Sequence, residues 1–293
     1  MTSTTVYAVT GAKGGIGKTT TSISVASVLA AAGRSVLLVD ADLAMANVAD
    51  FLEIEFEDGT HASVHDVLAG AVGPEDAIFE GPLGVDVMPC GSSLEDFAAV
   101  EATDLPALIA DLRGREYDEV VVDTGAGLSD ATLLPVAAAD EAVVVTRPRV
   151  GSVDNAVATI DLAGRVRTPV AGVVVTNATR AAPDGDSIAD ALGVDLLGTV
   201  SRDGAVPAAQ EQGRPVLQTD PAGPAAQAYR VIARRMVEIE TPGVRAVEAG
   251  PTATPETPAP ETGPPDADTR PAAEDRSVLG RVAAATVGRI AND

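Results

Sequence analysis

The chain has 293 residues, of which 46% are apolar and 2% are aromatic, and its net charge is −23. This length and apolar content suffice for one large α/β domain or two small ones. The acidic balance argues against non-specific binding of DNA or RNA through bulk charge. The single cysteine excludes an intramolecular disulfide and a cysteine-cluster metal site within one chain. No stretch is apolar enough for a transmembrane helix and no signal peptide is evident, so we expect a cytoplasmic protein.

The basic residues are 18 arginines and only two lysines. A low-lysine, acid-rich composition is typical of adaptation to a salty cytoplasm, where salt screens the repulsion among surface carboxylates. We therefore expect a halophilic source, with simple compositional drift as the alternative.

Residues 1–240 alternate short apolar, β-branched runs with alanine- and leucine-rich segments of helical spacing. Strands are predicted at Val6–Thr10, Val36–Val39, Val85–Met88, Val120–Val122, Ala142–Thr146, Gly172–Thr176 and Leu196–Val200. Helices are predicted at Thr19–Ala32, Ser63–Ala69, Leu105–Arg113, Asp130–Ala138, Val153–Arg165, Ser187–Leu192 and Ala222–Glu240. Continuous apolar runs are typical of strands buried on both faces of a parallel sheet. The alternation therefore predicts a doubly wound, mostly parallel α/β sheet.

The composition changes after this first domain of residues 1–240. Residues 241–275 contain eight of the 20 prolines, among Thr, Ala, Glu and Asp. Such a segment cannot bury enough apolar surface to offset its ordering entropy, so we predict a disordered acidic linker. Residues 276–293 regain helical spacing and predict a short, weakly amphipathic terminal helix.

Residues 11–20, with the sequence GAKGGIGKTT, form the sharpest motif in the chain. They follow a predicted strand and open a predicted helix, which is the context of a phosphate-binding loop. The glycines let backbone N–H groups turn toward phosphate oxygens, and the helix N-terminus adds partial positive charge. Lys18 can reach the β- and γ-phosphates, and the Thr19 hydroxyl can ligate Mg²⁺. Ala12 breaks the strict Walker A pattern, but both lysines of the chain, Lys13 and Lys18, lie in this loop.

The segment KGGIGKTT resembles the deviant Walker A loop of the MinD/ParA family of P-loop ATPases. The resemblance implies a P-loop NTPase fold that binds ATP and Mg²⁺ and forms an ATP-dependent homodimer. In that family the lysine that matches Lys13 reaches the nucleotide of the partner subunit. The residues implied to hold the nucleotide here are Gly14, Gly15, Ile16, Gly17, Lys18, Thr19 and Thr20.

Carboxylates end two of the predicted strands, where open α/β sheets bind ligands. The second strand ends in Asp40 and Asp42, and the fourth ends in Asp123, an arrangement that resembles Walker B. By resemblance to the family's switch I, Asp42 would orient or activate the attacking water and Asp40 would hold the Mg²⁺ shell. Asn47 would lie near the nucleotide, and Asp123 would contact Mg²⁺ through a water. Helix capping or a solvated turn is the alternative for the first pair.

Recognition of the base is less complete in the sequence. Asn177 follows the sixth predicted strand, where family members often have an asparagine that recognises adenine; an ordinary turn asparagine is the alternative. The family's Pro-x-Asp element corresponds to residues 201–203, which lack the proline. The family also often has proline where Gly125 stands. The resemblance covers residues 5 to about 238.

The branches of this family separate by simple features. Iron–sulphur carriers need cysteine pairs, whereas this chain has only Cys90, so we expect no iron–sulphur cluster. We predict a dimeric ATPase that hydrolyses ATP and positions cellular components, such as a division site or a chromosome. The alternatives are a nucleotide-gated adaptor with negligible turnover and a DNA-binding partition ATPase. The candidate DNA patch is Arg230, Arg234 and Arg235, and the net charge counts against it.

The terminal segment 276–290 places Val278, Leu279, Val282, Ala283, Val287 and Ile290 on one half of a helical wheel. It has no Phe or Trp to anchor it in a bilayer, but it carries three arginines. We predict that it docks on an anionic membrane surface or on an acidic protein partner, with residual disorder as the other alternative. Membrane docking would place the protein peripherally.

Overall fold

The computed structural model describes residues 4–54, 61–91, 100 and 102–237. The predicted linker 241–275 and terminal helix 276–293 lie outside the described residues. The strands are β1 Thr5–Thr10, β2 Val36–Ala41, β3 Phe79–Glu80, β4 Asp86–Met88, β5 Glu119–Thr124, β6 Glu141–Thr146, β7 Val170–Ala178 and β8 Leu196–Ser201. The helices are α1 Lys18–Ala31, α2 Val48–Phe51, α3 Val64–Leu68, α5 Leu105–Arg113, α6 Asp130–Ala138, α7 Val150–Arg165, α8 Gly185–Leu192, α9 Ala205–Gln210, α10 Val216–Thr219 and α11 Pro224–Val237.

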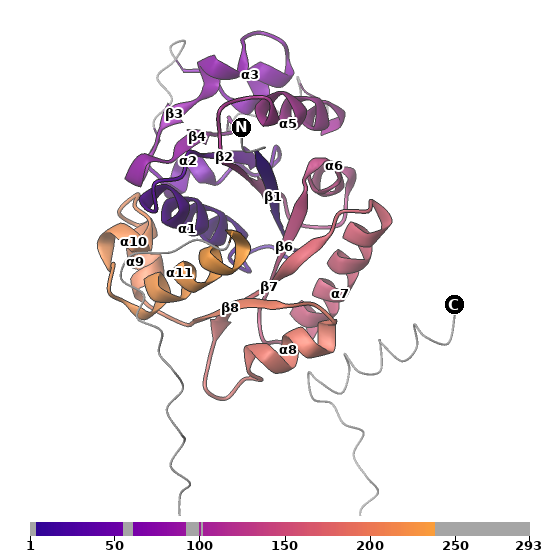
Figure 1. Cartoon of the computed structure of the whole chain (residues 1–293), viewed down its shortest axis with the longest axis vertical. Coiled ribbons are helices and arrows are strands. Elements are labelled where there is room, and N and C mark those ends of the chain that lie inside the picture. The colour runs from indigo at the N-terminus through magenta and orange to yellow at the C-terminus, as the bar shows by residue number, and fades with distance from the viewer. Residues whose placement is uncertain (1–3, 55–60, 92–99, 101, 238–293) are drawn as a thin grey trace, which may run out of the picture.

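The strands form one sheet in the order β3-β4-β2-β5-β1-β6-β7-β8 (Figure 1). All neighbouring strands are parallel except β3 and β4. The predicted doubly wound, mostly parallel α/β fold is therefore confirmed. The strand order reverses at β1, and ligands of open α/β sheets bind in the crevice at such a switch point.

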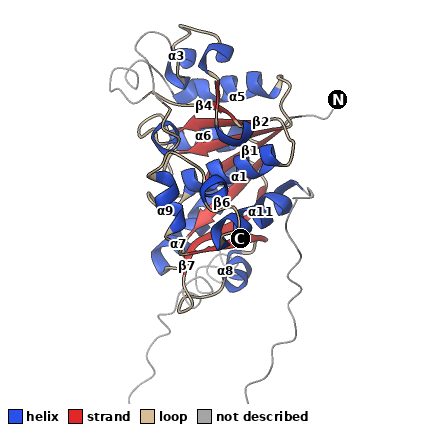
Figure 2. Ribbon diagram, turned by 90° about the vertical axis from the view of Figure 1, so that its left-hand side faces the viewer, coloured by secondary structure: helices blue, strands red, loops and turns tan. Residues whose placement is uncertain are grey.

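Helices cover both faces of the sheet (Figure 2). In β2, Val36 and Leu38 pack into the core formed with α1 and α11, whereas Leu37 and Val39 pack into the core formed with α5. Successive residues of a strand point to opposite faces, so a strand covered on both sides needs apolar residues at every position. This explains why the buried strands are continuous apolar runs in the sequence and could be predicted from it.

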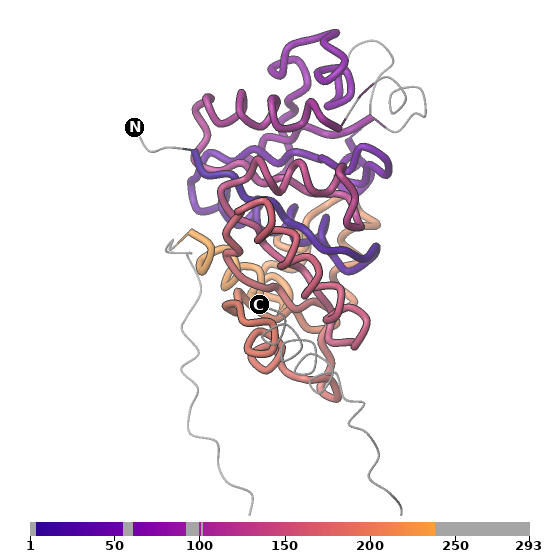
Figure 3. The backbone as a smooth tube through the Cα atoms, turned by 90° about the vertical axis from the view of Figure 1, so that its right-hand side faces the viewer, coloured from indigo at the N-terminus to yellow at the C-terminus, as the bar shows by residue number. Residues whose placement is uncertain are grey.

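In Figure 3, β1 crosses the middle of the molecule. The helices α3 and α5 lie toward the top of this view, and α8 lies toward its bottom. The structure reproduces the predicted bounds of α5 and α6, and α7 begins at Val150 instead of Val153. The sequence analysis missed β3, α2, α9 and α10, which have two to six residues and show no full period. Among the described residues, no helix is both long and apolar enough to cross a bilayer.

Candidate nucleotide site

A cavity of about 570 Å³ lies at the carboxyl ends of the parallel strands. The loops that follow β1, β2, β5, β6 and β8 contribute to its lining, as does the carboxyl end of β7 itself. The predicted site residues that line it are Gly14, Gly15, Ile16, Gly17, Lys18, Thr19, Thr20, Asp42, Asn47 and Asn177. Three others do not line it: Lys13 is exposed, and Asp40 and Asp123 are buried at the ends of β2 and β5.

The loop between β1 and α1 has the backbone of a phosphate cradle. Gly15 and Gly17 adopt φ angles of 69° and 99°, in the left-handed region that glycine enters at low cost. Gly17 caps α1, and no side chain among the described residues bonds to the first amides of that helix. These amides have no partner within the helix and carry its partial positive charge, so they can bind an anion.

Lys18 begins α1 and is 7% exposed. Burial lowers the pKa of its ammonium group, while the nearby carboxylates of Asp123 and Asp42 raise it. A buried cation between carboxylates and the cavity is stabilised further by an anion inside the cavity. The lysine therefore fits a role as a phosphate ligand.

Asp123 connects the phosphate loop to β5. Its two carboxylate oxygens accept hydrogen bonds from the Thr19 hydroxyl at 2.6 Å and the Ser22 hydroxyl at 2.8 Å. Because Thr19 uses its proton in this bond, its oxygen lone pairs stay available to a cation in the cavity. Sequence reasoning missed Ser22, although it lies three residues after Thr19 on the same face of α1.

Asp40 lies opposite Asp123 in the β2–β5 register and is fully buried. Its carboxylate accepts three backbone N–H bonds: from Asp42 at 3.0 Å, from Asn47 at 3.1 Å and from Val48 at 3.1 Å. The side chain therefore holds the loop of residues 42–48 in shape. A role in the Mg²⁺ shell remains a prediction.

Two buried carboxylates face each other here. Burial raises the pKa of Asp40 and of Asp123, and the charge of Asp123 raises that of Asp40 further. The hydrogen bonds that each group accepts oppose this shift. A nearby cation would favour the ionised forms, so the electrostatics of this pair fit a divalent metal ion.

The chemistry of the oxygen atoms around this pair shows whether they suit a divalent metal ion. Hydroxyl and carboxylate oxygens are ligands that Mg²⁺ prefers, and this ion usually takes one or two carboxylates together with phosphates and waters. The described residues contain no group of three or more His, Cys, Asp and Glu that could hold a metal ion on their own. Thr19 and Asp123 therefore fit a Mg²⁺ ion that shares its shell with a nucleotide.

Asp42 lies half-buried at the edge of the cavity. Burial raises the pKa of its carboxyl group, while the hydrogen bond from the Met45 amide, at 3.1 Å, and the charge of Lys18 lower it. The carboxylate contacts the loop after β5: a Cβ atom placed on Gly125 would lie 3.1 Å from Asp42 Oδ1. The two loops that follow β2 and β5 therefore meet at Asp42.

The other end of the cavity is more open. Asn177 is exposed at the end of β7 with φ 56°, a conformation that asparagine tolerates. The preceding Thr176 donates its hydroxyl hydrogen bond to the Ile16 carbonyl, which ties β7 to the phosphate loop. Asn177 is thus held at the lining of the cavity, and recognition of a base by this residue remains a prediction.

The lining also includes polar residues that were not among the predicted site residues, and the most polar of these are Arg147, Arg202, Asp203 and Gln210. Arg147 Nε and Asp203 Oδ2 are buried atoms for which the described residues supply no hydrogen-bond partner. Gln210 donates to the Thr20 hydroxyl at 2.7 Å and ties α9 to α1. Arg147 follows the carboxyl end of β6 and Asp203 that of β8, a signal that could have identified both.

Comparison with known proteins places this arrangement in a family. Residues 2–237 match the ParA family model, which is described as NUBPL iron-transfer P-loop NTPase. An uncharacterised ATP-binding protein of Methanocaldococcus jannaschii is 34% identical over 232 residues, which cover 78% of this chain and 86% of that protein. The septum site-determining protein MinD of Bacillus subtilis is 32% identical over 244 residues, which cover 80% and 89%.

The fold agrees with these relatives. The structure of MinD from Pyrococcus horikoshii complexed with Mg-ADP matches with a TM-score of 0.76 and 27% identity, over 80% of this chain and 96% of that one. The chain belongs to the ParA family of P-loop NTPases and has the fold of MinD.

Proposed function

We propose that the protein is an ATP hydrolase that works as an ATP-dependent homodimer and positions other components of the cell. The observation that carries this proposal is the convergence of Lys18, Thr19 and Asp42 on one cavity at the switch point of the sheet. These side chains supply a phosphate ligand, a metal ligand and a carboxylate for water, which phosphoryl transfer to water requires.

The chemistry divides among the chain's own residues. Lys18 and the first amides of α1 bind the phosphates, and Thr19 and Asp123 hold Mg²⁺, which when bound neutralises charge on the phosphate oxygens. Asp42 accepts a hydrogen bond from the attacking water and orients it toward the terminal phosphate. Asp40 keeps Asp42 in place through the Asp42 amide.

The two lysines of the loop differ in a way that supports a dimer. Lys18 is buried and lines the cavity, whereas Lys13 is exposed and does not. The exposed Lys13 side chain is placed to reach a nucleotide that a second chain presents. A homodimer with the phosphate loops facing each other provides such a nucleotide.

The base end offers groups that can bond to a purine base such as adenine. Asp203 Oδ2 has no partner among the described residues and accepts a hydrogen bond from an amino group such as that of adenine. Asn177 lies beside the same cavity and offers both a donor and an acceptor.

Two other branches of the family fit less well. Cys90 is 1% exposed and donates to the Asp40 carbonyl, and burial raises its thiol pKa, so it is a poor cluster ligand. In the candidate DNA patch, Arg230 donates to the Pro221 carbonyl and Arg235 to the Leu196 carbonyl. These bonds leave fewer free donors for DNA phosphates.

The proposal is tested by phosphate release from Mg-ATP in a buffer of high ionic strength, with light scattering to follow association. We expect steady release and an ATP-dependent shift from monomer to dimer. ATP binding and dimer formation with no release would support the nucleotide-gated adaptor instead. A chain that does not bind ATP would contradict the proposal. Docking through residues 276–290, on a membrane or an acidic partner, remains a prediction.

A further inference from the structure

The loop that carries Asp42 is held from two sides. From inside, the Asp40 carboxylate accepts the amides of Asp42, Asn47 and Val48. From outside, the His65 ring contacts the same loop, with Nε2 lying 3.1 Å from the Leu43 carbonyl oxygen. His65 belongs to α3 and is 2% exposed, and it is not among the residues that line the nucleotide cavity.

The hydrogen-bond partners determine which nitrogen of His65 carries the proton. The Gly91 amide lies 3.1 Å from Nδ1, and a backbone N–H can only donate, so Nδ1 must accept. A carbonyl oxygen can only accept, so Nε2 must donate to Leu43. Both bonds are satisfied together by the neutral ring with its proton on Nε2.

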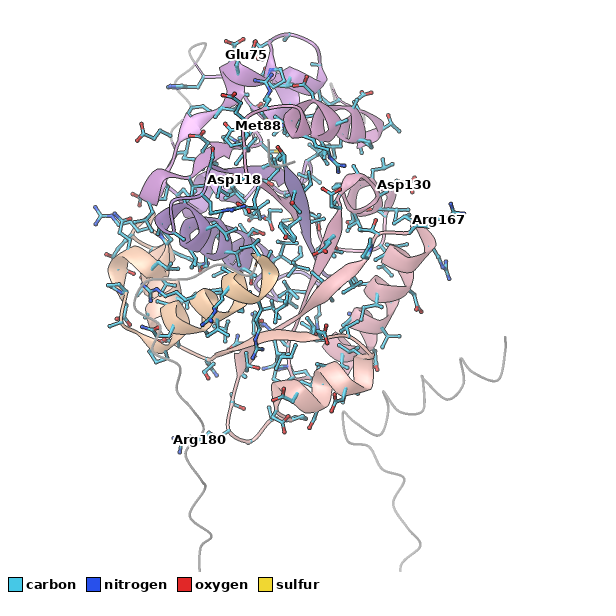
Figure 4. The ribbon with its side chains drawn as sticks, in the orientation of Figure 1. Glu75, Met88, Asp118, Asp130, Arg167 and Arg180 are labelled. Carbon is cyan, nitrogen blue, oxygen red and sulfur yellow. The ribbon has the colours of Figure 1, made fainter. Side chains whose placement is uncertain are left out.

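His65 projects from a firmly attached base. A reciprocal capping box between Ser63 and Asp66 closes the start of α3, and the Val64 amide donates to the Pro89 carbonyl at 2.9 Å. Leu43 and Val64 are buried in one core with Met88, which Figure 4 labels at the end of β4 near α3. The ring therefore connects the loop to a part of the fold that does not itself bind nucleotide.

Asp42 lies between the two attachments. Its amide bonds to Asp40, and the carbonyl of the next residue, Leu43, bonds to His65. These bonds orient the peptide plane that precedes Asp42 and the one that follows Leu43, and a carboxylate that directs water must be held within a fraction of an ångström. A loss of the outer bond would free the Leu43 peptide while leaving the phosphate loop untouched.

We propose that His65 is a positioning residue that sets the place of Asp42 through the Leu43 carbonyl. The inference rests on the proposed role of Asp42 in orienting water. It assigns α3 an indirect role in the hydrolytic step, through the loop that carries Asp42, although the helix lies outside the cavity.

A matched pair of variants separates the two bonds of the ring. His65→Gln can place its amide nitrogen near Nε2 and keep the donor to Leu43. His65→Asn can place its amide oxygen near Nδ1, which keeps the acceptor for Gly91 but removes the donor to Leu43. We expect kcat to fall about fivefold in His65→Asn, the value of one buried hydrogen bond, with ATP affinity within twofold of wild type. We expect His65→Gln to keep most of kcat.

Hydrogen exchange provides a readout without nucleotide. Amides of residues 43–48 should exchange about fivefold faster in His65→Asn than in wild type or His65→Gln, while those of β1 and β5 keep their protection. Equal losses in both variants, or normal exchange and kcat in His65→Asn, would overturn the proposal. If the wild type did not hydrolyse ATP, the proposed function would fail, and the exchange data would still test the His65 bond.

The wild-type ring can also be observed directly. The chain has two histidines, so ¹⁵N spectra of histidine-labelled, nucleotide-free protein are simple to assign. We expect His65 to carry a proton on Nε2 and none on Nδ1. A proton on Nδ1 would contradict the bond to Leu43, whether or not either variant folds.

Discussion

The two ends of the nucleotide cavity differ in how far the protein completes its own contacts. At the phosphate end, the buried Asp123 accepts hydrogen bonds from Thr19 and Ser22, and the buried Asp40 accepts hydrogen bonds from three loop amides. At the base end, Asn177 and Arg202 are exposed, and the described part of the chain supplies no hydrogen-bond partner for one carboxylate oxygen of Asp203. The phosphate end is therefore pre-organised for chemistry, whereas the base end depends on the ligand to satisfy it.

The strongest test of the pre-organised end is Asp42→Ala. The change removes the carboxylate that directs water but no phosphate contact, so we expect kcat to fall about 10²- to 10⁴-fold while ATP still binds. The dimer should accumulate with ATP because hydrolysis no longer releases it. Phosphate release and light scattering measure both effects. Loss of ATP binding itself would show that the assigned role is wrong.

Substitution of the two lysines, one at a time, separates ATP binding from dimer formation. Lys18→Ala should weaken ATP binding about 10- to 100-fold, because a charge-assisted contact to the phosphates is lost. Lys13→Ala is the matched control: it should bind ATP almost normally yet fail to form the ATP-dependent dimer. Calorimetry gives the affinities and light scattering the masses. An unchanged dimer in Lys13→Ala would contradict the contact in trans.

At the base end, Asp203→Ala should act on selectivity instead of turnover. We expect kcat/KM for ATP to fall about tenfold and the preference for ATP over GTP to narrow, with kcat little changed. Asp190→Ala, which removes an exposed carboxylate of α8 outside the cavity lining, is the control. An equal loss for ATP and GTP would argue against contact with the base.

The raised pKa of the buried Asp40 carboxyl group predicts how the stability of the folded protein depends on pH. Burial raises the pKa of Asp40 to about 8, above the ordinary value of roughly 4, so the folded state binds its proton more tightly than the unfolded chain. This contribution is fully present below about pH 4 and is lost as the pH rises toward about 8. The Tm of the nucleotide-free protein should therefore fall by several degrees across this window, at constant salt.

Addition of Mg-ADP provides the control for the pH experiment, because a bound cation favours the ionised carboxylates. The slope should flatten with Mg-ADP. A profile that is flat without ligand would contradict the raised pKa.

The smallest expected effect comes from Gly125→Ala. The new Cβ would lie 3.1 Å from Asp42 Oδ1, so the carboxylate must shift by a few tenths of an ångström. We expect kcat to fall about two- to threefold with unchanged ATP affinity. Gly151→Ala in α7, where a Cβ would meet nothing within 4 Å, is the control and should be silent. Unchanged turnover in Gly125→Ala would show that the Asp42 carboxylate has room to spare.

Much of this protein could be predicted from its sequence because the decisive signals are local. The doubly wound sheet followed from apolar runs that must fill both faces of a strand. The phosphate loop and the strand-end carboxylates followed from short motifs, and the structure brings most of these residues to one cavity. Lys18 and Thr19 needed no knowledge of distant segments to be recognised.

Tertiary structure decided what the sequence could not, because those contacts join remote segments. Ser22 bonds to Asp123, 101 residues away, only because α1 packs beside β5. The role of Asp40 in the Mg²⁺ shell stays a prediction, and only the fold shows that its oxygens also accept hydrogen bonds from three amides of its own loop. His65 had no motif at all: its bond to Leu43 exists because α3 packs against that loop in one core. Strand register and helix packing decide which polar groups come into contact in a core. Both involve segments that are remote in the sequence, so no local motif predicts them.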